Sequence, residues 1–88
     1  MNIYVDCEYD VSCLTKYTYL NEDGDFADGT SNFSKVMYGG ELIEILINCL
    51  KDYDVYTVHF ANNRIIVESF DPHSGETSVT EIDFTEAK

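Results

Sequence analysis

One segment of this chain has helical periodicity, and it constrains the possible folds more than any other feature. Its apolar residues recur at i, i+3, i+4, i+7 and i+8, which is the spacing of one face of an α-helix; they are Leu42, Ile45, Leu46, Cys49 and Leu50. Gly39-Gly40 interrupts the chain just before them. The pattern predicts a helix from about Glu41 to Asp52 that lies across a sheet as part of the core.

The N-terminal part alternates between apolar and polar residues, a period of two that is typical of a half-buried β-strand. The apolar set is Ile3, Val5, Cys7, Tyr9 and Val11. Ser12-Cys13 is predicted as a turn, and the composition of Leu14 to Leu20 favours a second strand paired antiparallel with the first. Asn21 to Asn32 is polar, acidic and contains two glycines, so we expect a long exposed loop. Phe33 to Tyr38 is interpreted as a short strand or an irregular segment leading to the helix.

Three further strands are predicted after the helix: Val55 to Ala61, Arg64 to Phe70 and Thr77 to Phe84. Asn62-Asn63 suits a tight hairpin, because Asn tolerates the positive φ that such turns require. The cross-strand pairs expected from these turns are Phe60–Ile65, Val58–Val67, Tyr56–Ser69, Phe70–Thr77, Ile65–Ile82 and Arg64–Asp83. The first three pairs would receive the helix, and the opposite face would carry a mixed set of side chains, namely Thr57, His59, Ile66 and Glu68.

These elements predict an α+β fold. It is a single antiparallel β-sheet of five to six strands with one α-helix packed on one face, in the order β-β-(β)-α-β-β-β, where the bracketed strand is Phe33 to Tyr38. The chain has 88 residues, which is the length of one domain and leaves no room for a second core. We therefore expect one acidic domain over residues 1–88.

Charge limits the functions that such a domain can have. Seventeen Asp and Glu residues face only five Lys and Arg, a net charge of −12. This imbalance accelerates encounters with positive surfaces. It argues against direct binding to nucleic acid or to an anionic membrane, because each phosphate contact normally needs a cation. The expected partner is a basic protein.

Location is predicted from apolar runs and from cysteines. No apolar run approaches the roughly 20 residues that a bilayer-spanning helix needs, and the N-terminus lacks a signal-peptide pattern. The three cysteines are odd in number and have no C-x-x-C spacing, and Cys7 and Cys49 fall on predicted apolar faces. We expect small buried thiols in a protein of the reducing cytoplasm.

The chain has no motif that indicates catalysis. It contains neither a Gly-rich phosphate loop nor a histidine in a metal-binding motif. The loop that starts at Asn21 begins like a calcium-binding loop, with Asp23 and Asp25 at the third and fifth positions. Phe26 stands where that loop needs glycine, and Asn32 where it needs a bidentate glutamate. We expect no enzymatic activity, no catalytic residue, no cofactor and no metal.

Acidic side chains near the N-terminus form the candidate binding site. Asp6, Glu8 and Asp10 are expected on one face of the first strand, about 6.5–7 Å apart along it, a spacing similar to that of successive phosphates in a nucleic-acid strand. The predicted loop adds Glu22, Asp23, Asp25 and Asp28. Aromatic side chains expected on the same strands would add flat contacts typical of interface hot spots; they are Tyr4, Tyr17 and Tyr19. The alternative is a solvated outer face whose charges discourage aggregation.

In its size, its charge, its α+β layout and its acidic segment from Asp6 to Asp28, the chain resembles the small acidic proteins by which phages and mobile elements disable host nucleases. Anti-CRISPR inhibitors and DNA-mimicking antirestriction proteins are examples. The resemblance implies a stoichiometric inhibitor, monomeric or a small homo-oligomer, that acts in the host cytoplasm. It would occupy the basic nucleic-acid-binding surface of a nuclease such as a CRISPR effector.

Two alternatives to this inhibitor remain open. The first is an immunity protein or antitoxin that neutralises one basic toxin. The second is a non-catalytic structural or interaction domain that associates with itself through a sheet edge or through the mixed face of Thr57, His59, Ile66 and Glu68.

Overall fold

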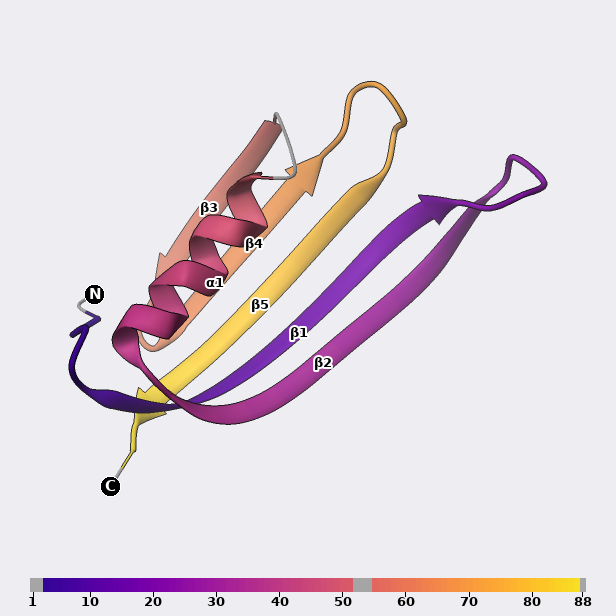
Figure 1. Cartoon of the computed structure of the whole chain (residues 1–88). Helices are drawn as coiled ribbons and strands as arrows, with labels where there is room; N and C mark the ends of the chain where they lie inside the picture. The colour runs from indigo at the N-terminus through magenta and orange to yellow at the C-terminus, as the bar shows by residue number, and fades with distance from the viewer. Residues whose placement is uncertain (1–2, 52–54, 88) are drawn as a thin grey trace.

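The computed structural model describes residues 3–51 and 55–87. Its elements, in chain order, are β1 (Glu8–Leu20), β2 (Phe26–Tyr38), α1 (Gly39–Lys51), β3 (Val55–Ala61), β4 (Arg64–Phe70) and β5 (Thr77–Glu86). All strand pairs are antiparallel, and they form one five-stranded sheet in the order β2-β1-β5-β4-β3 (Figure 1). The fold is α+β, with one helix inserted between the second and third strands.

The first two strands form one long hairpin, which differs from the sequence-based prediction. The predicted turn at Ser12-Cys13 lies inside β1, so Leu14 to Leu20 continues the first strand and does not pair with it. Phe26 to Asn32, predicted as loop, and Phe33 to Tyr38, predicted as a short strand or an irregular segment, together form β2. The actual loop is short, because the Oδ1 atom of Asn21 accepts hydrogen bonds from the backbone N–H groups of Asp23 and Asp25, both at 3.0 Å. A side chain that closes its own turn in this way allows two 13-residue strands to pair along their full length.

Residues 3–7 precede β1 and are not part of the sheet, although the alternation that begins with Ile3 predicted a strand there. Instead their carbonyl groups cap the start of α1. Gly39 N–H donates to the carbonyl of Cys7 at 2.8 Å, and Gly40 N–H donates to that of Val5 at 3.2 Å. The first N–H groups of a helix lack partners within the helix, so this segment satisfies them. Cys7 is consequently exposed rather than buried in the core.

The predicted register of the last three strands is confirmed. All six expected pairs occur, from Phe60–Ile65 to Arg64–Asp83. Asn63 adopts a φ of 59° in the β3–β4 turn, the conformation for which asparagine is suited. β5 ends two residues later than expected, at Glu86, because it also pairs with β1.

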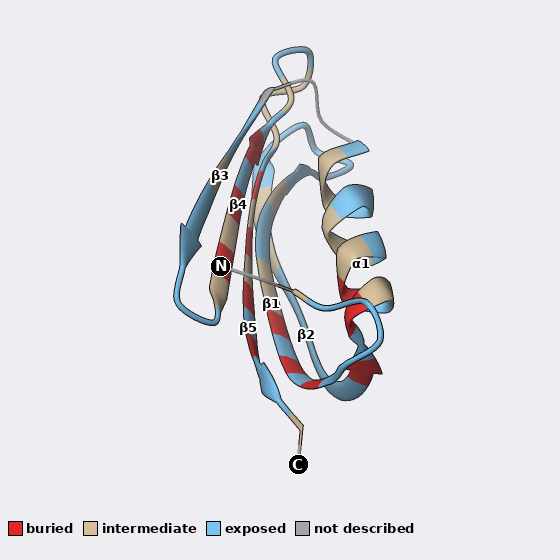
Figure 2. Cartoon of the chain, turned by 90° about the vertical axis from the view of Figure 1, so that its left-hand side faces the viewer, coloured by how far each residue is buried: buried red, intermediate tan, exposed pale blue. Residues whose placement is uncertain are grey.

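The core lies between α1 and one face of the sheet (Figure 2). Its buried residues are Tyr9, Val11, Cys13, Met37, Leu42, Ile65, Val67, Ile82 and Phe84. The Tyr9 and Phe84 rings meet edge to face, with centroids 5.9 Å apart. The prediction that β3 receives the helix is confirmed only in part. Val58 packs against the core, but Tyr56 and Phe60 are 50% and 60% exposed.

The other side of the sheet, here called the open face, carries no helix (Figures 1 and 2). The molecule measures 48 × 21 × 18 Å, and the tip of the β1–β2 hairpin projects away from α1 (Figure 1). Within residues 3–51 and 55–87, no helix has the length and apolar character needed to cross a membrane. A strand exposed on one side alternates buried and solvent-facing residues, so the open face displays every second side chain of all five strands.

Candidate acidic interface

Five carboxylates form an oblique line across the open face, which we call the acidic row. Its members are Glu8 and Asp10 on β1, Asp83 and Glu81 on β5, and Glu68 on β4. Each of these positions alternates with core residues, such as Tyr9 and Ile82, that point to the helix side. The row therefore brings together carboxylates from both ends of the sequence.

The strand register sets the spacing of the row. The pairs that place its members are Ser12–Asp83 and Leu14–Glu81 between β1 and β5, and Val79–Glu68 between β5 and β4. Each successive carboxylate is thus two residues further along the strand direction. With a rise of about 3.3 Å per residue and about 4.8 Å between strands, successive Cα atoms lie roughly 7–8 Å apart.

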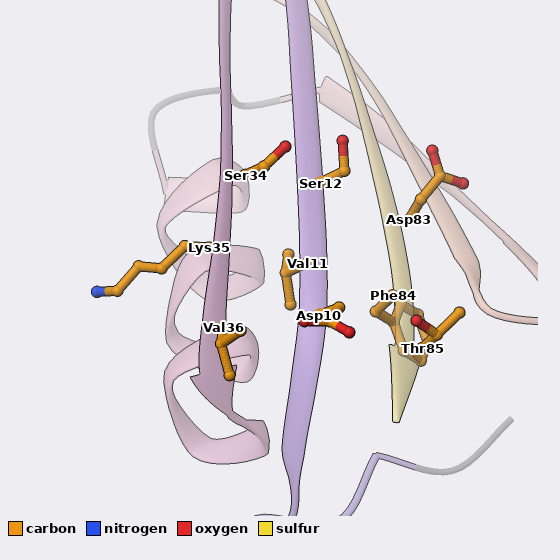
Figure 3. A pocket seen from close by; sticks show the side chains of 9 residues that line it. All are labelled: Asp10, Val11, Ser12, Ser34, Lys35, Val36, Asp83, Phe84 and Thr85. Atoms are coloured by element: carbon orange, nitrogen blue, oxygen red, sulfur yellow. The ribbon is translucent and has the colours of Figure 1, made fainter. Parts of the chain in front are cut away.

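A shallow hollow opens at the β1 end of the row, between β2, β1 and β5 (Figure 3). Its lining combines the apolar residues Val11, Val36 and Phe84 with hydroxyl and carboxylate groups, which come from Ser12, Ser34, Thr85, Asp10 and Asp83. These groups offer several hydrogen-bond acceptors to a cationic side chain. Lys35, which also borders the hollow, does not neutralise it, since its Nζ lies 4.0 Å from Glu41 Oε2 on the helix and points away from Asp83 (Figure 3).

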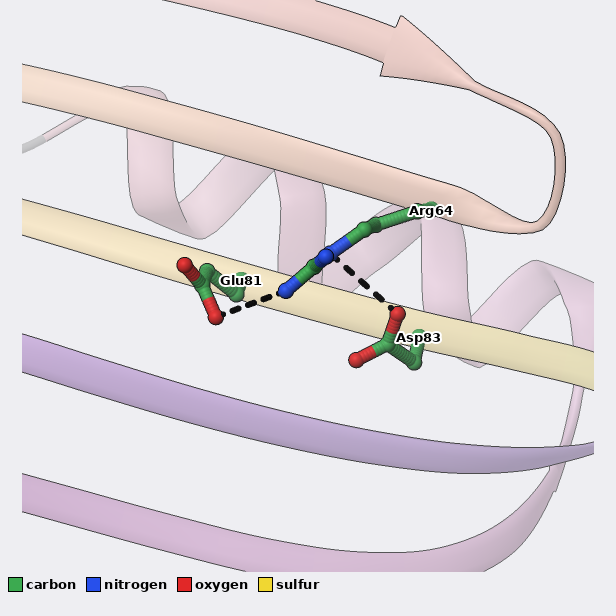
Figure 4. A network of polar contacts seen from close by, with 3 residues as sticks. All are labelled: Arg64, Glu81 and Asp83. Atoms are coloured by element: carbon green, nitrogen blue, oxygen red, sulfur yellow. Dashed lines mark hydrogen bonds and ion pairs between the residues drawn. The ribbon is translucent and has the colours of Figure 1, made fainter.

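Arg64 holds the middle of the row (Figure 4). Its Nη2 donates a hydrogen bond of 2.9 Å to Glu81 Oε2, and its Nε forms an ion pair of 3.3 Å with Asp83 Oδ1. The Nε atom is buried, and its contact with Asp83 is electrostatic rather than a well-aligned hydrogen bond. One guanidinium therefore fixes two carboxylates from a neighbouring strand and offsets part of their charge.

The remaining members of the row are less constrained. Glu68 Oε2 lies 3.7 Å from His59 Nε2, and both side chains are more than half exposed. Glu8 and Asp10 are exposed at the start of β1. Because successive members are 7–8 Å apart at the backbone, they suit several separate cations better than one shared ion. Across the described residues, no group of three Asp, Glu, His or Cys side chains is placed to hold a metal.

The structure separates the carboxylates that the sequence grouped. Glu8, Asp10 and Asp28 occupy the open face, but Asp6 lies in the turn before β1 rather than on the strand. Asp28 pairs with Thr18, ten residues along β1 from Glu8, which corresponds to about 33 Å. The other three predicted acids, Glu22, Asp23 and Asp25, lie in the hairpin loop beyond it. The predicted cluster is therefore two clusters at opposite ends of the hairpin.

The predicted tyrosines do not share a face with these acids. Tyr17 and Tyr19 lie on the helix side of β1, with ring centroids 6.0 Å apart. Tyr4 precedes β1, and its backbone N–H donates to the hydroxyl of Tyr9 at 2.9 Å. Two exposed aromatic residues lie next to the acidic row on the open face. Tyr38 pairs with Glu8 and is 51% exposed, and Phe70 stands two residues after Glu68 on β4 and is 41% exposed.

Sequence reasoning missed Glu68, Glu81 and Asp83 as site residues. Part of the signal was present, because the predicted register already paired Arg64 with Asp83 on one face. The missing information was the pairing of β1 with β5, which joins residues more than 60 positions apart. Only that pairing aligns the acids of β1 with those of β5.

Comparison with protein-family models, with curated proteins and with solved structures finds no match. Function is therefore inferred from the geometry of the chain itself. The feature with the most specific geometry is the acidic row.

Proposed function

We propose that this protein is an acidic inhibitor that binds the basic nucleic-acid-binding surface of a nuclease, such as a CRISPR effector, in the cytoplasm of the host cell. The observation that carries the proposal is the acidic row, in which five carboxylates are held at regular steps on three strands of one sheet. The row takes the place of successive phosphates. Its carboxylates pair with the arginine and lysine side chains that otherwise hold nucleic acid.

Rigidity favours this mode of binding. The members of the row are attached to paired strands, and Arg64 further fixes Glu81 and Asp83. Binding then requires little ordering of the inhibitor, whereas a flexible polymer loses more conformational freedom when it is bound. Complementary charge also accelerates association and selects for basic partners. Inhibition is stoichiometric and competitive with nucleic acid.

The hollow beside Asp10 and Asp83 suits an incoming guanidinium. An arginine forms its strongest contacts with carboxylates through paired N–H groups. The serine and threonine hydroxyls around the hollow accept the remaining N–H bonds. We expect a partner arginine there, at the β1 end of the acidic row.

The test is capture of partners from a bacterial lysate on the immobilised full-length chain, at low and then at high salt. Captured proteins are identified by mass spectrometry, and displacement of a labelled duplex from each one is measured by fluorescence anisotropy. One triple variant, Glu8→Gln/Asp10→Asn/Glu68→Gln, removes three of the five charges of the row and leaves the two acids that contact Arg64 in place. The matched control, Glu22→Gln/Asp23→Asn/Asp25→Asn, removes the same charge from the hairpin loop.

The row variant should lose at least tenfold in affinity, and the loop control should lose much less. Raising the salt concentration should weaken binding steeply, because the Debye length falls from about 10 Å at 0.1 M to about 3 Å at 1 M. Equal losses in the two variants would show that total charge, not the row, determines binding. Capture of one basic toxin without nucleic-acid-binding activity would instead favour an antitoxin.

A further inference from the structure

Strand β3 is an edge strand without the usual protection. It pairs with β4 on one side, and no other strand of the described chain pairs with its second side. Soluble proteins normally protect such edges with charged side chains, proline, bulges or a covering element. β3 has the sequence Val-Tyr-Thr-Val-His-Phe-Ala, with no acidic residue, lysine, arginine or proline, and it pairs with β4 without a bulge. The opposite edge, β2, differs because it carries Asp28 and Lys35.

The residues of β3 are arranged symmetrically about Val58. Tyr56 and Phe60 stand two positions before and after it, on the helix side of the sheet, and both are at least half exposed. Thr57 and His59 stand one position before and after it, on the open face. In an antiparallel pair of two such strands centred on Val58, each aromatic ring faces an aromatic ring of the other copy. Aromatic cross-strand pairs are among the stabilising pairs in sheets.

Charge also favours this edge over the other surfaces. Two copies each carry a net charge of −12, so they approach most easily where carboxylates are sparse. The neighbouring strand β4 contributes one carboxylate, Glu68. In the paired arrangement the two Glu68 residues lie three strand spacings apart, about 14 Å, which exceeds the Debye length of about 8 Å at physiological salt. On α1, Glu41 and Glu44 border a hollow with Phe33 of β2, away from β3.

We propose that two copies of this chain associate by antiparallel pairing of β3 with β3 about Val58, which creates a continuous ten-stranded sheet. The two-fold axis is perpendicular to the sheet, so both helices lie on one side and both open faces on the other. Tyr56 of each copy packs against Phe60 of its partner. The proposal is independent of the inhibitory function, but it would place two acidic rows on one face.

The experiment is sedimentation velocity and equilibrium of the full-length reduced chain, from low micromolar to submillimolar concentration. We expect a concentration-dependent monomer–dimer equilibrium of moderate strength, since an interface of one strand pair is small. Raising salt from 0.1 M to 1 M should strengthen the dimer, because screening weakens the repulsion between copies. Partner binding through the acidic row should weaken as salt rises, which is the opposite response. A failure of the dimer proposal can therefore be distinguished from a failure of the proposed inhibitory function.

Two pairs of variants test the interface and its register. Phe60→Thr should raise the dimer dissociation constant at least tenfold, whereas the matched control Phe33→Thr, an exposed aromatic on the β2 edge, should leave it unchanged. Tyr56→Lys and Phe60→Glu should each weaken self-association, and mixing them should restore a heterodimer with one charge pair across the axis. A wild-type chain that stays monomeric at every concentration would overturn the proposal. A dimer that weakens equally in both threonine variants, or no heterodimer on mixing, would overturn it as well.

Discussion

The guanidinium of Arg64 on β4 reaches across β5 and contacts both Asp83 and Glu81, with Asp83 directly opposite Arg64 in the strand register. The two contacts differ in kind, since Nη2 makes a hydrogen bond of 2.9 Å and Nε an ion pair of 3.3 Å. Arg64 is the only cation on β4 or β5. It therefore limits the repulsion between two carboxylates that share one face of β5.

Replacement of this arginine should destabilise the fold modestly. Arg64→Gln leaves Glu81 and Asp83 without their common cation, and because the side chains are partly exposed we expect a loss of about 1 kcal/mol in the free energy of unfolding. Lys35→Gln, which removes the same charge from a more exposed pair with Glu41, should change it by less than about 0.5 kcal/mol. Urea denaturation followed by circular dichroism measures both. Equal losses in the free energy of unfolding of the two variants would show that the effect comes from net charge alone.

Two adjacent glycines should respond in opposite ways to alanine. A Cβ atom at Gly39 would collide with the backbone carbonyl of Tyr4, whereas at Gly40 its nearest neighbour would be the Val5 side chain at 3.2 Å, with the Val5 carbonyl oxygen at an ordinary contact distance of 3.9 Å. We expect Gly39→Ala to cost about 2 kcal/mol or more, because the capping segment must move. Gly40→Ala should be neutral or stabilising by up to about 1 kcal/mol, from the higher helix propensity of alanine. Thermal melts of both variants would test this, and a stable Gly39→Ala protein would contradict the close packing of residues 3–7 on α1.

Thiol reactivity should rank the cysteines by burial. Burial, and then the nearby Cys49, raise the pKa of the Cys13 thiol, while a hydrogen bond with Thr15 opposes this, so Cys13 stays protonated at neutral pH. The thiolate is the reactive form, so Cys13 should react slowly with an alkylating reagent in the native state. Exposed Cys7 should react first. Peptide mapping after timed alkylation identifies each site, with Cys7→Ser as the control that removes the fast phase.

The raised pKa of the Cys13 thiol also affects the stability of the fold at high pH. A thiol whose pKa is raised by folding stabilises the native state below its unfolded pKa, and this contribution is lost as pH rises through the folded pKa. The free energy of unfolding should therefore fall in the alkaline range. Cys13→Ala should remove this part of the pH dependence in denaturation curves, whereas Cys7→Ser should leave it in place.

Acid should loosen the β4–β5 loop. Asp71 Oδ1 accepts a hydrogen bond of 2.9 Å from the backbone N–H of His73, which lowers the pKa of Asp71. A lowered pKa means that the carboxylate stabilises the loop above its unfolded pKa and that this contribution is lost as pH falls through the folded value. Carbon-detected NMR titration should show a midpoint for Asp71 below the ordinary aspartate range. Asp71→Asn should abolish the accompanying shift of the His73 amide signal; a shift that persists would assign it to another group.

The C-terminal half of the fold was predictable from local patterns. Asn62-Asn63 specifies a two-residue turn, and once that turn is placed, the alternation of Ile65, Val67 and Ser69 sets the register of β3 and β4. The helix was also predictable, because its apolar spacing has no counterpart in a strand. It begins at Gly39, two residues before the expected start, and its expected last residue, Asp52, lies outside the described residues. These features depend on residues close in sequence.

The N-terminal half was less predictable. Composition favoured a loop over residues 26–32, but the backbone pairing of β2 with β1 dominates over composition once Asn21 closes the turn. Apolar and polar residues do alternate before Glu8, but this segment does not join the sheet. Its carbonyl groups instead accept hydrogen bonds from the first N–H groups of α1. The local sequence pattern cannot show whether the backbone carbonyl groups of this segment will bond to a neighbouring strand or to the start of a helix.

The sequence by itself determined the charge, the helix and the short hairpins, since these depend on composition and on neighbours within a few residues. The tertiary structure decided which carboxylates share a surface. Pairing of β1 with β5 joins distant segments, and a side chain in a strand faces one side or the other according to a period of two. That pairing placed Glu8 and Asp10 beside Asp83 and Glu81, and put Tyr17 and Tyr19 on the opposite face.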